Sequence, residues 1–167
     1  MKLTMTGIAT ALALLLMVSS GPAVQPAPGD LGPPADFMVT QNADSIFFSW
    51  LPVEGADKYT VETCGMITWG DGSIRGEVPL KMGICTKDEI GMVYMRSGRV
   101  VLEIPKATLA RIVLAELQDA GVDRASVIGF LLEATSKVKA LDPGKGKGPQ
   151  NNPWSNTDDW ECLWTRS

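Results

Sequence analysis

Alternating apolar and polar side chains predict short β-strands in the first half of this chain. Segment 45–50 (SIFFSW) places Ile46, Phe48 and Trp50 on one face, as on a strand with one buried side. The following PVEGA sequence interrupts the alternation as a turn does, because Pro fixes φ and Gly tolerates positive φ. Alternation then resumes over 58–62. The pattern predicts two antiparallel strands after a short lead strand.

A second pair of strands is predicted over 92–104. Val100, Leu102 and Ile104 alternate with polar or smaller residues. The Ser97-Gly98 dipeptide that precedes them is typical of a hairpin turn, so we expect 92–95 to pair with this strand.

Residues 106–141 support two interpretations. Apolar residues recur there at three- and four-residue spacing, as on amphipathic helices. They are Leu109, Ile112, Val113, Leu117 and Ala120, followed by Val127, Leu131, Ala134, Val138 and Leu141. With a helix cap at Asp123 and a stop at 142–144, they predict a helical hairpin over 106–141. Alternatively, 130–134 is a strand and only the region around 106–126 is a helical insertion.

The first half of the chain resembles strands A, B and C of a fibronectin type III domain. The resemblance runs through PADFMV (34–39), SIFFSW (45–50), PVEGA (52–56) and YTVE (59–62). That family has a Trp at the end of strand B, a proline-led turn, and a strand C Tyr that packs near the Trp. Trp50 and Tyr59 match these places. The resemblance implies a seven-stranded β-sandwich and a role in adhesion or as a spacer.

Three later segments extend the resemblance less closely. Leu114–Leu117 followed by 119–121 resembles the family's leucine-bearing corner, which gives Leu117 a core position. Segment 130–134 resembles strand F, and 146–149 with 152–153 resembles the loop towards strand G. We therefore expect a mostly β, fibronectin type III-like antiparallel sandwich with a helical insertion around 106–126. The alternative is an α+β fold with the helical hairpin 106–141.

The chain divides into four predicted regions. Residues 1–20, with Lys2 ahead of an apolar run, predict a signal peptide. Residues 21–35 are Pro-rich and predict an extended linker. Residues 36–150 hold the fibronectin type III-like domain, and 151–167 form a Trp- and Asp-rich C-terminal segment. The protein is expected to be secreted, periplasmic or surface-displayed, with membrane attachment only if the leader stays uncleaved.

Composition argues against some classes of partner and excludes some classes of catalytic and metal site. The 167 residues carry a net charge of −4 and no basic cluster, which argues against nucleic acid as a partner. The absence of histidine excludes Ser-His and Cys-His nucleophile pairs, His-ligated zinc and an imidazole base. We expect no cofactor and no metal.

The three cysteines of an exported chain are expected to oxidise. Cys64 and Cys85 are the nearest pair and the first candidate for a disulfide. A bond between Cys64 and Cys162 is the alternative. The third thiol is then either buried or paired with another chain.

The C-terminal segment offers candidate ligand contacts. Trp154, Trp160 and Trp164 are interspersed with Asp158, Asp159 and Glu161. Exposed Trp rings beside carboxylates can stack on sugars and hydrogen-bond their hydroxyl groups. Alternatively, the rings pack in the core, with Trp160 and Cys162 pointing inward from a last strand, or contact a partner chain.

These observations favour an exported, non-catalytic binding or adhesion module whose partner is a protein or a glycan. One alternative is a structural subunit of an extracellular or viral assembly. Another is a small glycan hydrolase that uses the carboxylates of Asp158, Asp159 and Glu161.

Overall fold

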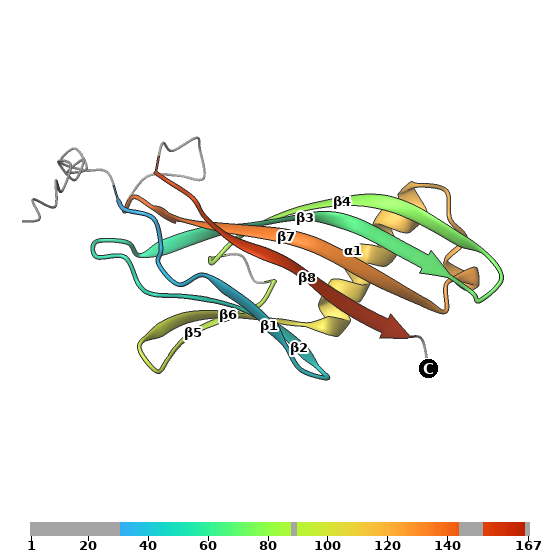
Figure 1. Cartoon of the computed structure of the whole chain (residues 1–167), viewed down its shortest axis with the longest axis horizontal. Helices are drawn as coiled ribbons and strands as arrows, with labels where there is room; N and C mark the ends of the chain where they lie inside the picture. The colour runs from blue at the N-terminus through green and yellow to red at the C-terminus, as the bar shows by residue number, and fades with distance from the viewer. Residues whose placement is uncertain (1–30, 88–89, 144–151, 166–167) are drawn as a thin grey trace, which may run out of the picture.

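The computed structural model describes residues 31–87, 90–143 and 152–165. The predicted signal peptide, most of the Pro-rich linker and the 146–149 loop lie outside these residues. The described chain forms two four-stranded antiparallel sheets and one α-helix (Figure 1).

Sheet A has the strand order β1-β2-β6-β5, and sheet B has the order β4-β3-β7-β8. The strands of sheet A are β1 (Met38–Gln41), β2 (Ser45–Trp50), β5 (Met92–Arg96) and β6 (Arg99–Pro105). Those of sheet B are β3 (Lys58–Gly70), β4 (Arg75–Cys85), β7 (Gly129–Leu141) and β8 (Ser155–Thr165). The helix α1 (Lys106–Asp119) and a short 3-10 helix η1 (Arg124–Ser126) lie between β6 and β7. The prediction of a mostly β, two-sheet fold is confirmed.

The predicted hairpin over 92–104 is confirmed as β5 and β6. Arg96 and Arg99 are opposite each other, and Ser97 and Gly98 form the two-residue turn with φ of 50° and 76°. Positive φ at both turn positions matches the twist of the flanking strands, and Gly adopts it without steric cost.

Trp50 lies at the centre of the contact between the two sheets. Its side chain is fully buried, and its ring centroid lies 5.1 Å from that of Tyr59 on β3 and 6.1 Å from that of Phe37. The Tyr59 hydroxyl accepts a hydrogen bond of 2.9 Å from the Val53 amide, which fixes the turn between β2 and β3. The Trp50 indole N–H has no hydrogen-bond partner in the described part of the chain, so the packing of the ring is what this residue contributes.

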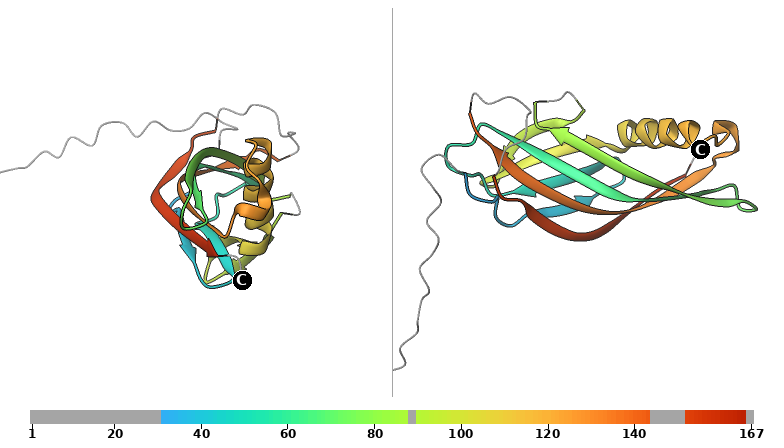
Figure 2. Two further views of the ribbon diagram at one scale, coloured as in Figure 1. Left: turned by 90° about the vertical axis from the view of Figure 1, so that its right-hand side faces the viewer. Right: turned by 90° about the horizontal axis from the view of Figure 1, so that it is seen from above.

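Sheet B is longer than sheet A, and α1 covers the excess. Strands β3 and β7 have 13 residues each, whereas the longest strand of sheet A has seven. The helix continues directly from β6 and lies over the part of sheet B that sheet A does not reach (Figure 2). Its buried residues belong to the same core as both sheets: Leu109, Ala110, Val113, Leu114 and Leu117. No helix in the described ranges is long and apolar enough to cross a membrane.

The alternative prediction of a helical hairpin over 106–141 is wrong in its second half. The first helix ends where Gly121 adopts a φ of 81° and its amide donates to the Gln118 carbonyl. Asp123 does cap a helical turn, accepting a 3.0 Å hydrogen bond from the Ala125 amide, but that turn is only η1. Residues 129–141 form β7, where every second side chain from Phe130 is buried. Leu117 is a core residue on α1 rather than in a corner loop.

The C-terminal segment supplies β8, which pairs along β7 as the edge of sheet B. A β-bulge interrupts this pairing between Ala134 and Ser136. Hydrogen bonds also join β8 to β1 and to the segment before it: the Gln41 side-chain amide donates to the Glu161 carbonyl, and the Ser155 hydroxyl donates to the Pro34 carbonyl. The β1 and β8 edges therefore close one side of the sandwich.

Gly65 provides the first test of this packing. A Cβ at Gly65 would lie against the Glu133 carbonyl oxygen and 2.8 Å from the Ala134 Cα, and neither backbone atom can move without breaking the β3–β7 ladder. We expect Gly65→Ala to lower the free energy of unfolding by about 2–3 kcal/mol in urea denaturation. Gly83→Ala on β4 is the control, because a Cβ there meets nothing within 4 Å. Equal stability of the two variants would contradict the close approach of β3 and β7.

Candidate functional site

A groove crosses the outer face of sheet A. It encloses about 390 Å³ and is lined mainly by Thr40, Phe47, Ser49, Tyr94, Arg96 and Arg99. We call it the sheet A groove. It brings two aromatic side chains and two guanidinium groups together.

The strand register places these side chains together. Ser49, Val101 and Tyr94 lie in one row across β2, β6 and β5, and Phe47 and Glu103 lie in the next. Residues directly opposite each other in a ladder point to the same face, so both rows project away from the core. Val101 is buried beneath its neighbours and forms an apolar floor.

The Arg99 side chain is fixed in the groove wall. Its Nη2 donates to the carbonyl oxygens of Asp36 and Ser49, and its Nε lies 3.4 Å from the Ser49 hydroxyl. Arg96 lies directly opposite Arg99 and is exposed. Neither guanidinium takes part in an ion pair among the described residues. Like charges at opposite positions repel each other, so an anion bound between them would relieve an unfavourable pair.

Glu103 forms no ion pair with these arginines among the described residues. Its two carboxylate oxygens accept hydrogen bonds from the Ser45 hydroxyl at 2.8 Å and from the Tyr94 hydroxyl at 3.0 Å. Desolvation and the contact with Glu103 raise the pKa of Tyr94, so its hydroxyl stays protonated and keeps donating. The groove therefore has an aromatic wall, an apolar floor and a positive end.

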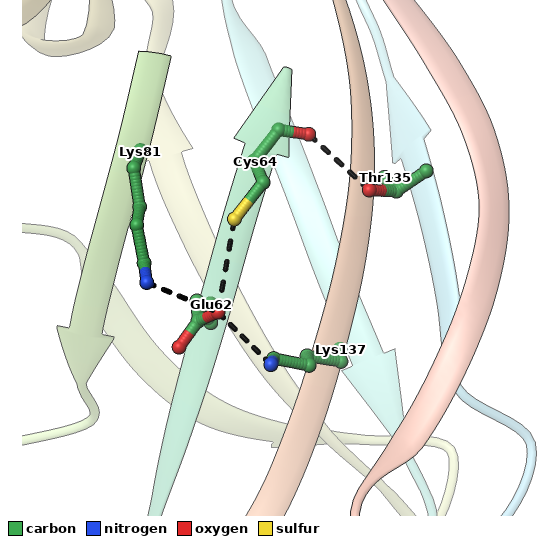
Figure 3. Close-up of polar contacts among 5 residues, drawn as sticks. All are labelled: Glu62, Cys64, Lys81, Thr135 and Lys137. Atoms are coloured by element: carbon green, nitrogen blue, oxygen red, sulfur yellow. Dashed lines mark hydrogen bonds and ion pairs between the residues drawn. The ribbon is translucent and has the colours of Figure 1, made fainter.

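The outer face of sheet B carries a separate ionic network, which we call the Glu62 cluster (Figure 3). Lys137 Nζ lies 2.9 Å from Glu62 Oε1, and Lys81 Nζ lies 4.0 Å from the same oxygen. The Cys64 thiol contacts that oxygen at 3.7 Å, and the Thr135 hydroxyl donates to the Cys64 carbonyl. The hydrogen bond from Lys137 holds the pKa of Glu62 below its ordinary value. The cluster joins three neighbouring strands through paired charges and is best explained as a stabilising surface network.

The three predicted ligand-contact tryptophans lie on different faces. Trp160 and Trp164 project from the inner side of β8: Trp160 donates to the Ser136 hydroxyl at 2.9 Å, and Trp164 stacks on Phe130. Trp154 lies on the outer side, with the ammonium groups of Lys137 and Lys139 at 4.5 and 4.8 Å from its ring centroid. The structure therefore does not gather the three rings into one ligand-binding surface.

The predicted carboxylates are found at the β8 edge. Asp159 and Glu161 are exposed there, and the side chain of Asp158 lies outside the described residues. Among the described residues, no group of three or more acidic or thiol side chains is arranged to hold a metal ion.

Neither predicted disulfide is formed. Cys64 is opposite Lys81 on β4, four residues from Cys85, which corresponds to about 13 Å along the strand. Cys64 also lies on the outer face of sheet B, whereas Cys162 is buried on the inner face of β8, two strands away. A disulfide requires Cα atoms within about 7 Å, so the fold excludes both pairs. Burial raises the pKa of the Cys162 thiol, which keeps it protonated.

Sequence reasoning did not single out the sheet A groove. Two features of the sequence could have indicated the groove. Phe47 is apolar although alternation assigns it to the solvent face, and Arg96 and Arg99 flank a two-residue turn. Neither feature is informative until the partner strand and its register are known.

The Glu62 cluster gives a pH-dependent prediction. Because the folded-state pKa of Glu62 is lowered, its contribution to stability is complete above the ordinary value of 4.5 and is lost as pH falls through the folded-state pKa. We expect Glu62→Gln to lower the urea midpoint at pH 7 and to match the wild type well below pH 4.5. Glu77→Gln, an exposed carboxyl on β4, is the control and should have little effect at either pH. A Glu62→Gln deficit that persists at low pH would contradict the ion-pair explanation.

Comparison with known proteins identifies no relative of this chain. No family model matches the chain, and no curated protein or solved structure shows significant similarity to it. The functional argument therefore depends on the geometry of the sandwich and its surface.

Proposed function

We propose that this protein is an exported, non-catalytic binding module of fibronectin type III type, with the sheet A groove as its binding surface. Its partner is a protein or glycan that presents a carboxylate or another anionic group beside a flat apolar one. The pair of arginines beside Phe47 and Tyr94 is the observation that carries this proposal.

The strand order supports the family assignment. If β1 to β8 are named A, B, C, C′, D, E, F and G, the two sheets have the orders A-B-E-D and C′-C-F-G. Immunoglobulin-like sandwiches place A, B, E and D in one sheet and C, F and G in the other. The contact between Trp50 and Tyr59 also matches the strand B and strand C positions of fibronectin type III domains.

The groove supports a binding role because one of its two guanidinium groups, that of Arg99, is already positioned. Arg99 is held by three contacts to Asp36 and Ser49, so less side-chain entropy is lost when it binds an anion. A guanidinium can bind a carboxylate through two parallel hydrogen bonds, and a neighbouring aromatic ring can pack against the rest of the ligand.

Export is proposed from the apolar leader and the Pro-rich stretch that follows it. In this arrangement the linker holds the sandwich away from whatever precedes it.

Probe arrays test the proposed ligand class. Oligosaccharides with and without uronic or sialic acid, and acidic and neutral decapeptides, would be screened against the chain from Gly21 onward. We expect acidic members of at least one series to bind in preference to their neutral counterparts. Arg96→Ala should weaken that binding roughly tenfold, because one charge-assisted contact is lost.

Arg75→Ala is the matched control. Arg75 is also exposed and also carries one positive charge, but it lies on β4 of sheet B. An equal loss of binding in both variants would show general charge attraction rather than a site in the groove. Absence of acidic preference in both series would overturn the proposal.

A further inference from the structure

Three of the four sheet edges carry features that prevent another strand from pairing with them. The β4 edge contains Pro79 and alternates charged residues such as Glu77 and Lys81 on its outer face. The β8 edge carries a bulge with Asp159 and Glu161. The β1 edge is tied to β8 by the hydrogen bond from the Gln41 side chain to the Glu161 carbonyl. Proline, charges and bulges are the usual protection of a sheet edge.

The β5 edge is different. Met92, Val93 and Met95 are 58%, 42% and 59% exposed, although they lie on both faces of a regular five-residue strand. Within the described chain, β5 has β6 as its neighbour on one side and no strand on the other. The one charged residue of β5 is Arg96 at its end, and an apolar edge with so little protection is a template for adding a strand.

The backbone groups of β5 fit such an addition. The pair Arg96 and Arg99 next to a two-residue turn is a hydrogen-bonded one, and bonded and non-bonded pairs alternate along an antiparallel ladder. The amide and carbonyl groups of Val93 and Met95 therefore point away from β6, towards the open edge.

We propose that the β5 edge pairs with β5 of a second copy of this chain. In an antiparallel pair centred on Tyr94, Val93 of each copy lies opposite Met95 of the other. Their outward-pointing backbone groups then form two hydrogen-bonded pairs. The contact between Val93 of one copy and Met95 of the other therefore occurs twice, once on each side of the two-fold axis, as in any closed dimer interface.

Charge also favours a second copy as the occupant. In this register, Arg96 lies opposite Met92 of the other copy, and Met92 is itself opposite Glu103 on β6. Glu103 and Arg96 of the other copy therefore lie in one row with Met92 between them, two strand spacings or about 10 Å apart, so this attraction is weak but acts over a shorter distance than the repulsion between like charges. The two Arg96 residues are about 13 Å apart, beyond the screening length of about 8 Å.

Sedimentation velocity over a range of concentrations tests the proposal on the chain from Gly21 onward, under reducing conditions. We expect a monomer–dimer equilibrium that Met95→Lys weakens at least roughly tenfold. Met38→Lys is the matched control, because Met38 is 50% exposed on β1 at the other edge of sheet A. A wild type that stays monomeric at every concentration would overturn the proposal, as would equal effects of both variants.

A crosslink keeps the test decisive if Met95→Lys fails to fold. Tyr94 lies on the two-fold axis, where a non-hydrogen-bonded pair brings the two Cα atoms to about 4.5 Å, within disulfide range. In a Cys64→Ser background, Tyr94→Cys should oxidise to a covalent dimer, whereas Met92→Cys should not. Equal crosslinking of the two would exclude this register. The outcome is independent of ligand binding, because the arrays measure the groove and these experiments measure the edge.

Discussion

The inner face of sheet B has to be covered along its whole length, and this requirement shapes the rest of the structure. Strands of 13 residues present about twice as many inward side chains as the short strands of sheet A can cover. The chain meets the requirement by passing from β6 straight into α1. The Lys106 amide donates to the Asp44 carbonyl at 2.7 Å, so the start of the helix is anchored to the turn between β1 and β2. Sheet A and α1 together act as one covering layer.

This covering has a consequence for function. Core side chains fill the space between the layers, so recognition is assigned to the outer faces and edges of the sheets. The outer face of sheet B pairs Lys137 and Lys81 with the carboxylate of Glu62 in the Glu62 cluster. The outer face of sheet A leaves Arg96 and Arg99 without a carboxylate partner among the described residues, and its β5 edge leaves apolar side chains exposed. The two proposed interactions therefore lie on the same sheet.

The sequence predicted the strands with regular alternation and the residues they bury. Trp50 and Tyr59 meet as expected, and the 97–98 turn is where the dipeptide indicated. The helical insertion around 106–126 and the strand over 130–134 are confirmed as α1 with η1 and as β7. Only the alternative helical hairpin over 106–141 is wrong, because the apolar residues of β7 fit both a helical and a strand period. The predicted disulfides failed because separation along the chain says nothing about register. Cys64 and Cys85 are on adjacent strands, but four positions apart.

The candidate site was beyond prediction for a related reason. The groove consists of residues from four strands, and only the pairing of β5 with β6 and of β6 with β2 places Tyr94 near Ser49. Alternation assigned Phe47 to the face opposite Ile46, Phe48 and Trp50, but it did not indicate which side chains would surround Phe47 there. The tail tryptophans looked like a cluster, yet the alternation of β8 directs Trp160 inward and Trp154 precedes the strand.

Amide hydrogen exchange measured by NMR over a range of denaturant concentrations tests the central claim that α1 is part of the covering layer. If the helix and sheet B share one core, the amides of Val113 and Leu117 exchange only through global unfolding. Their opening free energy and denaturant dependence then equal those of Ile67 and Leu132. If the α1 amides exchange through a low-energy local opening while sheet B stays protected, the helix does not hold the sandwich together and the account is contradicted.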